Sequence, residues 1–451
     1  MVKRDRREYM TKTPVPKLIL TLAVPTIISM MVTAVYNTAD TFFVARVSSD
    51  PVTNTAATAA VGLVFTVMAL IQALGFFCGH GSGNYLSRML GAGNTKEANE
   101  MASTGFALSL IIGCVFALVG NIFIHPIAAF LGAGATPLTV EFTIRYMRII
   151  LIGAPFMMAQ FVINNQLRFQ GSAYYAMIGL MCGAVMNMVL DPLLILVFHL
   201  GVRGAAIATV IGQFTSFCVL LIGTKKGENI KLRLSNVHIN AHYFKEIVNG
   251  GIPSLFRQGL AAIATLILNN TAGAIGSDAA IAGMSVATRV MMMMASALIG
   301  FGQGYQPMCS FNYGAGLTNR VKEGYKFCVK YSTIVLVGIG AVCFIFAPDI
   351  IALFSKDEAA VSVGIAALRF LCVTLPLSGA IVISNMMLQS IGKGVKASIT
   401  ASARNGICFI PLILVLPMIF GLTGVEMAQS CADVLSLLIA LPMALSELKK
   451  F

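Results

Sequence analysis

The sequence contains very little charge and no tryptophan. Only 11% of its 451 residues are Asp, Glu, Lys or Arg, whereas 57% are hydrophobic, and the mean hydropathy is +0.84. A soluble domain carries about 25% charged residues, so the composition excludes a soluble globular protein and predicts a polytopic membrane protein. Interfacial aromatic belts, which usually contain Trp, must be built here from 11 Tyr and some of the Phe.

The sequence also lacks paired cysteines and motifs for catalysis. None of its ten cysteines forms a C-x-x-C pair, and we expect them to be small buried hydrophobes rather than disulfides. The histidines show no metal-ligand spacing, and we expect all five in or near loops: His80, His125, His199, His238 and His242. No nucleophile–base motif is present, so we expect no enzyme and no cofactor.

The net charge of +13 is explained by where the basic residues lie, not by a nucleic-acid partner. They are concentrated in alternate polar breaks: Lys3, Arg4, Arg6, Arg7, Lys12, Lys17, then Lys225, Lys226, Lys231, Arg233, Lys245, then Arg320, Lys322, Lys326, Lys330, and finally Lys449 and Lys450. Only Arg46, Arg203 and Lys356 fall in the other loops. This positive-inside pattern predicts cytoplasmic termini and an even number of spans.

The apolar runs predict twelve membrane-spanning helices. We expect them at residues 16–44, 56–77, 98–123, 139–163, 173–198, 205–222, 247–274, 279–304, 325–346, 359–383, 395–420 and 425–445. The long basic break in the middle predicts an N-terminal lobe at 1–222, a cytoplasmic linker at 223–245 and a C-terminal lobe at 246–451.

The two halves repeat one another. Gly79, Gly81, Gly91 and Gly93 match Gly302, Gly304, Gly314 and Gly316 at an offset of 223. Arg148, Pro155, Asn164 and Gly171 match Arg369, Pro376, Asn385 and Gly392 at 221, and Gly201 and Gly204 match Gly421 and Gly424 at 220. Two parallel six-helix bundles follow, and a cavity between such halves is the usual site for a transported substrate. The glycines are more simply explained by close helix packing than by ligand binding.

The fifth expected span carries polar residues near its outer end. Asn187 and Asp191 are four residues apart and share a helix face. Pro192 has no N–H, which loosens the carbonyl of Met188 one turn earlier. Such a group of oxygens suits a proton or a small hard cation. A buried Asp held by a neighbouring helix is the structural alternative, but an ionised Asp in a span costs about 2.5–3.5 kcal/mol, which favours function.

The first expected span carries Tyr36, Asn37 and Asp40, with Asn37 and Asp40 on one face. If this span touches the fifth, two carboxylates share a dry site that could load and release a proton or cation. The second half has no matching carboxylate on its seventh span. Its Asp433 is expected to pair with Arg257 or Arg289 in a structural role, with a second coupling site as the alternative; Glu426 lies nearby.

Weaker candidates could line a substrate cavity. Methionine-rich surfaces accept varied ligands, and 25 Met is a high number, although a Met run is most often core. The candidates are Tyr36, Asn37, Gln160, Asn164, Met291, Met294 and Asn385.

These features together resemble the multidrug and toxic compound extrusion (MATE) family over nearly the whole chain. The resemblance is carried by Ala23-Val24-Pro25, Asp40, Gln170-Gly171 and, most specifically, Asn187…Asp191-Pro192, and it is best for the prokaryotic DinF/MepA-like branch. It implies two six-helix lobes forming a V and an H⁺ or Na⁺ site in the N-terminal lobe. The implied ion-coupling residues are Asp40, Asn187, Asp191 and Thr209, with the Ala205 backbone nearby.

The resemblance also implies a function. It predicts a cation- or proton-coupled antiporter that rocks between two openings and exports bulky amphipathic, often cationic, drugs or dyes. The expected location is the bacterial plasma (inner) membrane, as a monomer in the lipid bilayer. A lipid-linked precursor flippase of the same superfamily is the alternative. Twelve spans and few arginines in the expected cavity argue against a flippase, whereas Arg257 and Arg289 argue for it.

Overall fold

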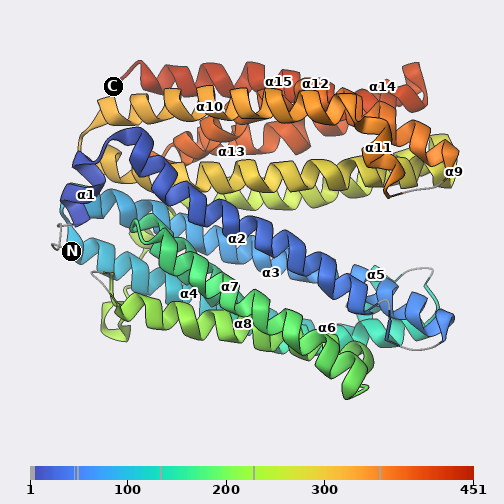
Figure 1. Ribbon diagram of the computed structural model, residues 1–451. Coiled ribbons are helices and arrows are strands. Elements are labelled where there is room, and N and C mark those ends of the chain that lie inside the picture. The colour runs from blue at the N-terminus through green and yellow to red at the C-terminus, as the bar shows by residue number, and fades with distance from the viewer. Residues whose placement is uncertain (1–5, 45, 48–49, 133–134, 227–228, 355–356) are drawn as a thin grey trace. The chain divides into compact units, whose positions relative to one another are not determined.

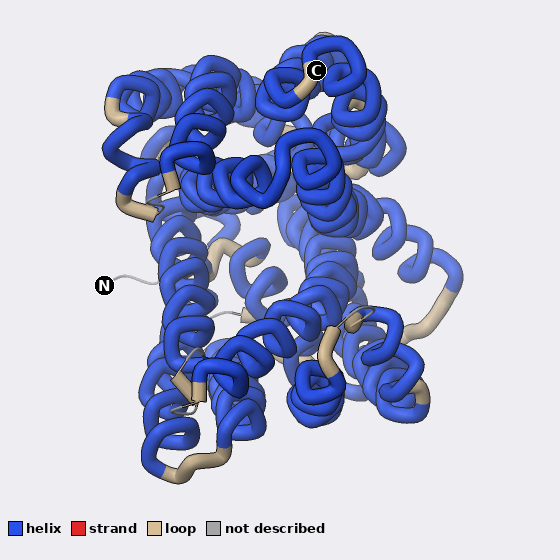
Figure 2. The backbone as a smooth tube through the Cα atoms, turned by 90° about the vertical axis from the view of Figure 1, so that its right-hand side faces the viewer, coloured by secondary structure: helices blue, strands red, loops and turns tan. Residues whose placement is uncertain are grey.

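The computed structural model describes residues 6–44, 46–47, 50–132, 135–226, 229–354 and 357–451, and within these the side chains of residues 34, 36–42 and 277–278 are not described. The described chain is helical throughout and contains no strand (Figures 1 and 2). Its elements are α1 (Arg6–Lys12), α2 (Val15–Val44), α3 (Pro51–Ala92), α4 (Thr95–Ile122), α5 (Ile124–Leu131), α6 (Pro137–Phe169), α7 (Ala173–Pro192), η1 (Leu193–Val197), α8 (Gly201–Lys225), η2 (Leu234–Asn236), α9 (Ala241–Gly314), α10 (Thr318–Ile345), α11 (Ala347–Ala352), α12 (Glu358–Ser390), α13 (Gly394–Ser402), η3 (Ala403–Ile407), α14 (Phe409–Phe420) and α15 (Leu422–Leu448).

The described residues contain twelve helical segments long and apolar enough to cross a membrane, which confirms the predicted number. α9 contributes two of them, Ala241–Gly276 and Ala279–Gly314. The predicted limits were too narrow where a helix continues beyond its apolar part. The second span, expected at 56–77, belongs to α3 and runs over Pro51–Ala92.

The ends of α3 explain that extension. The Asp50 carboxylate accepts hydrogen bonds from the backbone N–H groups of Val52 (3.3 Å) and Thr53 (3.0 Å), and Pro51 occupies the first turn. At the other end Gly93 has φ +82°, a left-handed conformation that glycine adopts without strain. Hydropathy therefore marks the part of the helix that suits lipid, whereas caps decide where the helix ends.

The chain forms two compact units. Unit 1 comprises residues 1–7, as far as they are described, and 28–251, and unit 2 comprises 8–27 and 252–451. The chain passes from one unit to the other inside α1, inside α2 next to Pro25, and inside α9 next to Pro253. The expected lobes at 1–222 and 246–451 stay a prediction.

Glycines allow close helix contacts at repeat-related places in each unit. In unit 1, a methyl group on Gly81 of α3 would lie 2.3 Å from the carbonyl oxygen of Ile247 on α9. In unit 2, a methyl group on Gly304 of α9 would lie 2.3 Å from the Cα of Ala23 on α2. Such distances leave no room for a side chain, which confirms close packing as the use of these glycines.

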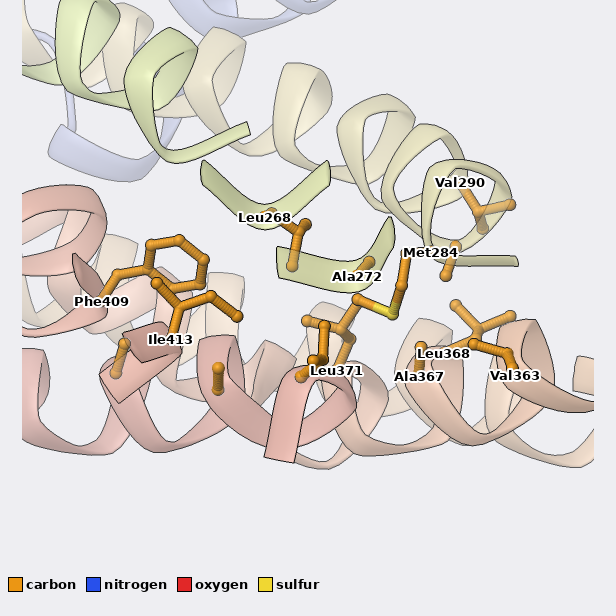
Figure 3. Packing of buried hydrophobic residues seen from close by; sticks show 14 of the residues in the cluster. Leu268, Ala272, Met284, Val290, Val363, Ala367, Leu368, Leu371, Phe409 and Ile413 are labelled. Atoms are coloured by element: carbon orange, nitrogen blue, oxygen red, sulfur yellow. The ribbon is translucent and has the colours of Figure 1, made fainter. Parts of the chain in front are cut away.

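Each unit also has an apolar core between its helices. In unit 2, Leu268, Ala272, Met284 and Val290 of α9 face side chains of α12 and α14, as Figure 3 shows. In unit 1 the corresponding cluster joins α3, α6 and α8. These cores fix the helices from which the polar side chains project.

The repeat is visible in one hydrogen bond of each unit. Asn164 of α6 donates to the carbonyl oxygen of Ala176 on α7 at 3.0 Å, and Asn385 of α12 donates to that of Ala397 on α13 at 2.6 Å. Both partners are related by the offset of 221 predicted from the sequence. The same side-chain bond therefore ties the fourth span to the fifth and the tenth to the eleventh.

Candidate functional site

The candidate ion site is built where regular α-helix ends in the fifth span. α7 ends at Pro192, and the next residues form a π-helix, η1. Proline supplies no N–H to the helical ladder, and π-helical turns are found frequently at functional sites. The change of helix type follows Pro192, and the predicted loosening of the Met188 carbonyl stays a prediction.

Asn187 and Asp191 are buried together inside unit 1. The exposed fractions are 3% for Asn187 and 0% for Asp191. Asn187 donates through Nδ2 to Oδ1 of Asp191 at 3.4 Å, and its own Oδ1 accepts no hydrogen bond from the described residues. A carboxylate and a neighbouring amide oxygen at a buried position provide hard oxygen ligands of the kind that Na⁺ or a proton would use.

The packing of α7 against α8 determines what lies opposite these residues. A methyl group on Gly183 would lie 2.6 Å from the carbonyl oxygen of Gly212, and one on Gly204 would lie 2.8 Å from that of Leu194. The two helices are antiparallel, so this register puts Asp191 opposite the turn 205–209. Within it Ala205 is 0% exposed and Thr209 is 4% exposed.

The sequence also predicted contributions from α2. The backbone of Tyr36, Asn37 and Asp40 belongs to α2, but their side chains lie outside the described residues. Their part in the ion site and in a cavity stays a prediction. In the part of the chain that the structure describes, no group of three or more His, Cys, Asp or Glu side chains is arranged to hold a metal ion.

The weaker cavity candidates differ in their surroundings. Asn164 and Asn385 are buried and tie helices together through the bonds described above. Gln160 is 1% exposed. Met291 and Met294 pack against the apolar core of unit 2. A substrate role for any of them stays a prediction.

The predicted partner of Asp433 was wrong, although a partner exists. The Asp433 carboxylate, 1% exposed, accepts from Arg404 Nε at 2.7 Å and from Gln429 at 3.0 Å. Arg404 lies in the π-helix η3, which brings the eleventh span against α15. Arg257 instead donates to Asn385 and Ser254.

Sequence reasoning missed two polar clusters of unit 1. His80 was expected near a loop but is 0% exposed within α3, at 3.4 Å from the buried Arg168 guanidinium. The second span was expected to end at residue 77, which put His80 beyond it, whereas α3 continues to Ala92. Tyr85 donates to Glu97 at 2.8 Å and lies 3.0 Å from His242 Nε2, linking α3, α4 and α9. No spacing signal in the sequence indicates that cluster.

Comparisons with known proteins support these observations. The MatE family model matches residues 25–193 and 253–415. The multidrug export protein MepA of Staphylococcus aureus is 27% identical over 98% of this chain and 96% of its own length, and MepA of Staphylococcus saprophyticus has the same values.

Solved structures agree in fold. An outward-facing multidrug resistance MATE family transporter of the MOP superfamily has a TM-score of 0.91, 27% identity and full coverage of both chains. A MOP superfamily transporter from Pyrococcus furiosus, described as having a binding pocket of reverse polarity that suggests a different function, has a TM-score of 0.91 and 26% identity over 100% of this chain and 99% of that one. The family model covers more than half of the sequence, so this chain is a multi-pass membrane protein that belongs to the MatE family of transporters and is not an enzyme.

Proposed function

We propose that this protein is an antiporter that exports bulky amphipathic drugs or dyes in exchange for H⁺ or Na⁺. The MepA relatives are named as multidrug export proteins, and the similar structures include a multidrug resistance transporter. The protein would alternate between inward and outward openings in a bacterial plasma membrane, as a monomer with both termini in the cytoplasm. The charge bias of its loops supports that orientation.

The observation that carries the proposal is Asp191. It is a carboxyl group with no exposed surface, on a membrane span, beside Asn187 and in a helix packed closely against α8. An intramembrane carboxyl is rare and usually functional, because removing its charge from water is unfavourable. Binding a proton or Na⁺ would neutralise it, so occupancy of this site can favour one conformation over the other.

The driving force is sufficient for export. Moving one charge through a membrane potential of 100 mV releases about 2.3 kcal/mol. At about 1.4 kcal/mol per factor of ten, this supports roughly fiftyfold accumulation of a drug per net charge moved across the membrane. An ion gradient adds to that value.

The test is dye transport in inverted membrane vesicles with H⁺ and Na⁺ gradients imposed separately. Wild type should transport ethidium with at least one gradient, and Asp191→Asn should lose gradient-driven transport while still binding the dye. Asp349→Asn, which changes an exposed carboxylate on α11, is the matched control and should behave as wild type. If Asp191→Asn pumps normally, the coupling site is wrong; if wild type pumps no dye but its loss causes a lipid precursor to accumulate, the flippase alternative is right.

A further inference from the structure

An arginine in the seventh span lacks an acidic partner. Arg257 lies near the middle of the 36-residue span Ala241–Gly276. Arginine stays charged in proteins, and at the centre of a membrane helix it costs at least as much as a buried carboxylate. Such a residue is retained when it faces protein, water or a ligand rather than lipid.

The contacts of Arg257 leave much of its hydrogen-bonding capacity unused. One Nη donates to Asn385 Oδ1 at 3.0 Å and the other to Ser254 Oγ at 3.4 Å. Both acceptors are neutral, and in the described part of the chain no carboxylate lies within ion-pair distance of this guanidinium. A guanidinium has five N–H donors in a planar fork, so several remain for another group.

The neutral partners hold Arg257 in place. Gln389 donates to Ser254 Oγ at 2.8 Å, and Gln306 donates to Gln389 at 3.0 Å. These residues belong to α9 and α12 and are buried, with exposed fractions of 0% for Ser254 and Gln306 and 1% for Gln389. A donor fixed by such a network is preorganised for a ligand and loses little entropy on binding.

The internal repeat shows that helix packing does not require this charge. Asn385 is tied to Ala397 as Asn164 is tied to Ala176 in the first half. Within the described residues, Asn164 makes its bond with no guanidinium hydrogen-bonded to it, so this helix contact does not require the charge of Arg257.

Arg257 is only partly buried, so a part of its surface is accessible. Lipid tails cannot satisfy that surface, which leaves water or the polar group of a substrate. We infer that Arg257 binds the carboxylate of amphipathic substrates and thereby extends the range of the transporter to zwitterionic compounds. This inference rests on the proposed export function and specifies its substrate class.

A single carboxylate suits the site better than a phosphate. The fork of a guanidinium matches the two oxygens of a carboxylate, and one positive charge balances one negative charge. A phosphate carries more charge, whereas the hydrogen-bond partners of Arg257 in the described residues are a neutral amide and a neutral hydroxyl group. Substrates that are only cationic would gain nothing from Arg257.

The experiment compares two dyes that differ only at this group: a zwitterionic xanthene dye with a free carboxylate, and its cationic methyl ester. Transport of each is measured in inverted vesicles carrying wild type, Arg257→Gln or Arg257→Lys. Arg257→Gln should raise the half-saturating concentration of the carboxylate dye about tenfold or more, and that of the ester less than twofold. Arg257→Lys should fall between, since it keeps the charge without the fork.

The control is Arg369→Gln, which removes another intramembrane guanidinium of unit 2, one that lies over the Phe344 ring at 5.4 Å. It should affect the two dyes equally. Equal losses for both dyes in Arg257→Gln, or export of the ester but not of the carboxylate dye by wild type, would overturn the inference while export itself stands. If wild type exports neither dye, the proposed function fails, and binding of the carboxylate dye to the purified wild type and Arg257→Gln proteins decides the role of Arg257.

Discussion

Removing Arg404 tests whether Asp433 has a structural role. The Arg404→Leu substitution leaves the Asp433 carboxylate, 1% exposed, without its cation and with Gln429 as its remaining side-chain donor in the described residues. The paired substitution Arg404→Leu/Asp433→Leu removes both charges and leaves apolar side chains in their place. If the pair is structural, the single substitution lowers the stability more than the double one, because it leaves a buried charge without a partner.

The size of the effect follows from the burial. Breaking a buried ion pair by removing one partner costs about 3–5 kcal/mol, whereas replacing both by apolar residues is often neutral. Arg404 keeps 24% of its side chain exposed, so we expect the lower end of that range. For a unit of about 200 residues, each kcal/mol shifts the Tm by about 2–4 °C. The single variant should therefore melt roughly 6–12 °C below wild type and the double variant close to it.

The assay can use the protein's own cysteines. Tryptophan fluorescence is not available, since the sequence has no Trp. Six of its ten free cysteines are buried, namely Cys78, Cys309, Cys328, Cys343, Cys372 and Cys408. A thiol-reactive dye that fluoresces on reaction therefore reports unfolding of the purified protein in detergent.

Transport by the same variants distinguishes a structural role of Asp433 from a role in ion coupling. A structural pair predicts that Arg404→Leu/Asp433→Leu melts normally and still couples dye export to its ion gradient. If the double variant melts normally but no longer couples, Asp433 is a second coupling site and the structural reasoning is refuted. If Arg404→Leu melts as wild type does, the ion pair contributes nothing to stability and the reasoning fails at its first step.

Two further substitutions test the packing. Gly81→Ala should destabilise the protein by about 1–3 kcal/mol or more, because its methyl group would meet the Ile247 carbonyl oxygen at 2.3 Å. Gly62→Ala, where a methyl group would have nothing within 4 Å, is the control and should be neutral or slightly stabilising. Equal melting temperatures of the two variants in the thiol assay would contradict this prediction. Asn164→Leu should cost about 1–3 kcal/mol by leaving the buried carbonyl of Ala176 without its side-chain donor, and an unchanged Tm would show that the repeated bond does not hold the two helices.

Hydropathy was sufficient to predict the membrane spans because lipid imposes a simple rule on length and polarity. It could not predict helix ends, since α3 continues over polar residues until Gly93 ends it. The repeat offset of 221 relates Asn164 to Asn385, and each of these side chains makes the same hydrogen bond to the following helix. A sequence repeat that keeps a polar residue within an apolar helix thus predicts a repeated contact.

The sequence did not predict which side chains pair with each other across helices. Asp433 needed a cation, and five arginines were available in the second half, but it is the π-helix η3 that brings Arg404 to it. His80 was misplaced because hydropathy ended the second span at residue 77, whereas α3 continues past it and Gly79, Gly81 and Gly83 lie against residues of other helices. Spacing along one helix predicts which residues share a face, and packing alone decides what that face meets.

The two halves use one scaffold for different chemistry. In unit 1 the buried carboxyl, Asp191, is hydrogen-bonded by a neutral amide. The buried carboxyls of unit 2 in the described residues are Glu426, Asp433 and Glu447. A guanidinium bonds Asp433 and two lysines bond Glu447, while the hydrogen-bond partners of Arg257 are neutral. A site that must gain and lose a proton or Na⁺ cannot keep a permanent cation beside its carboxylate, because that cation would occupy the place of the ion. We therefore propose that ion coupling takes place at Asp191 in unit 1, and that Asp433 and Arg257 of unit 2 serve stability and the choice of substrate.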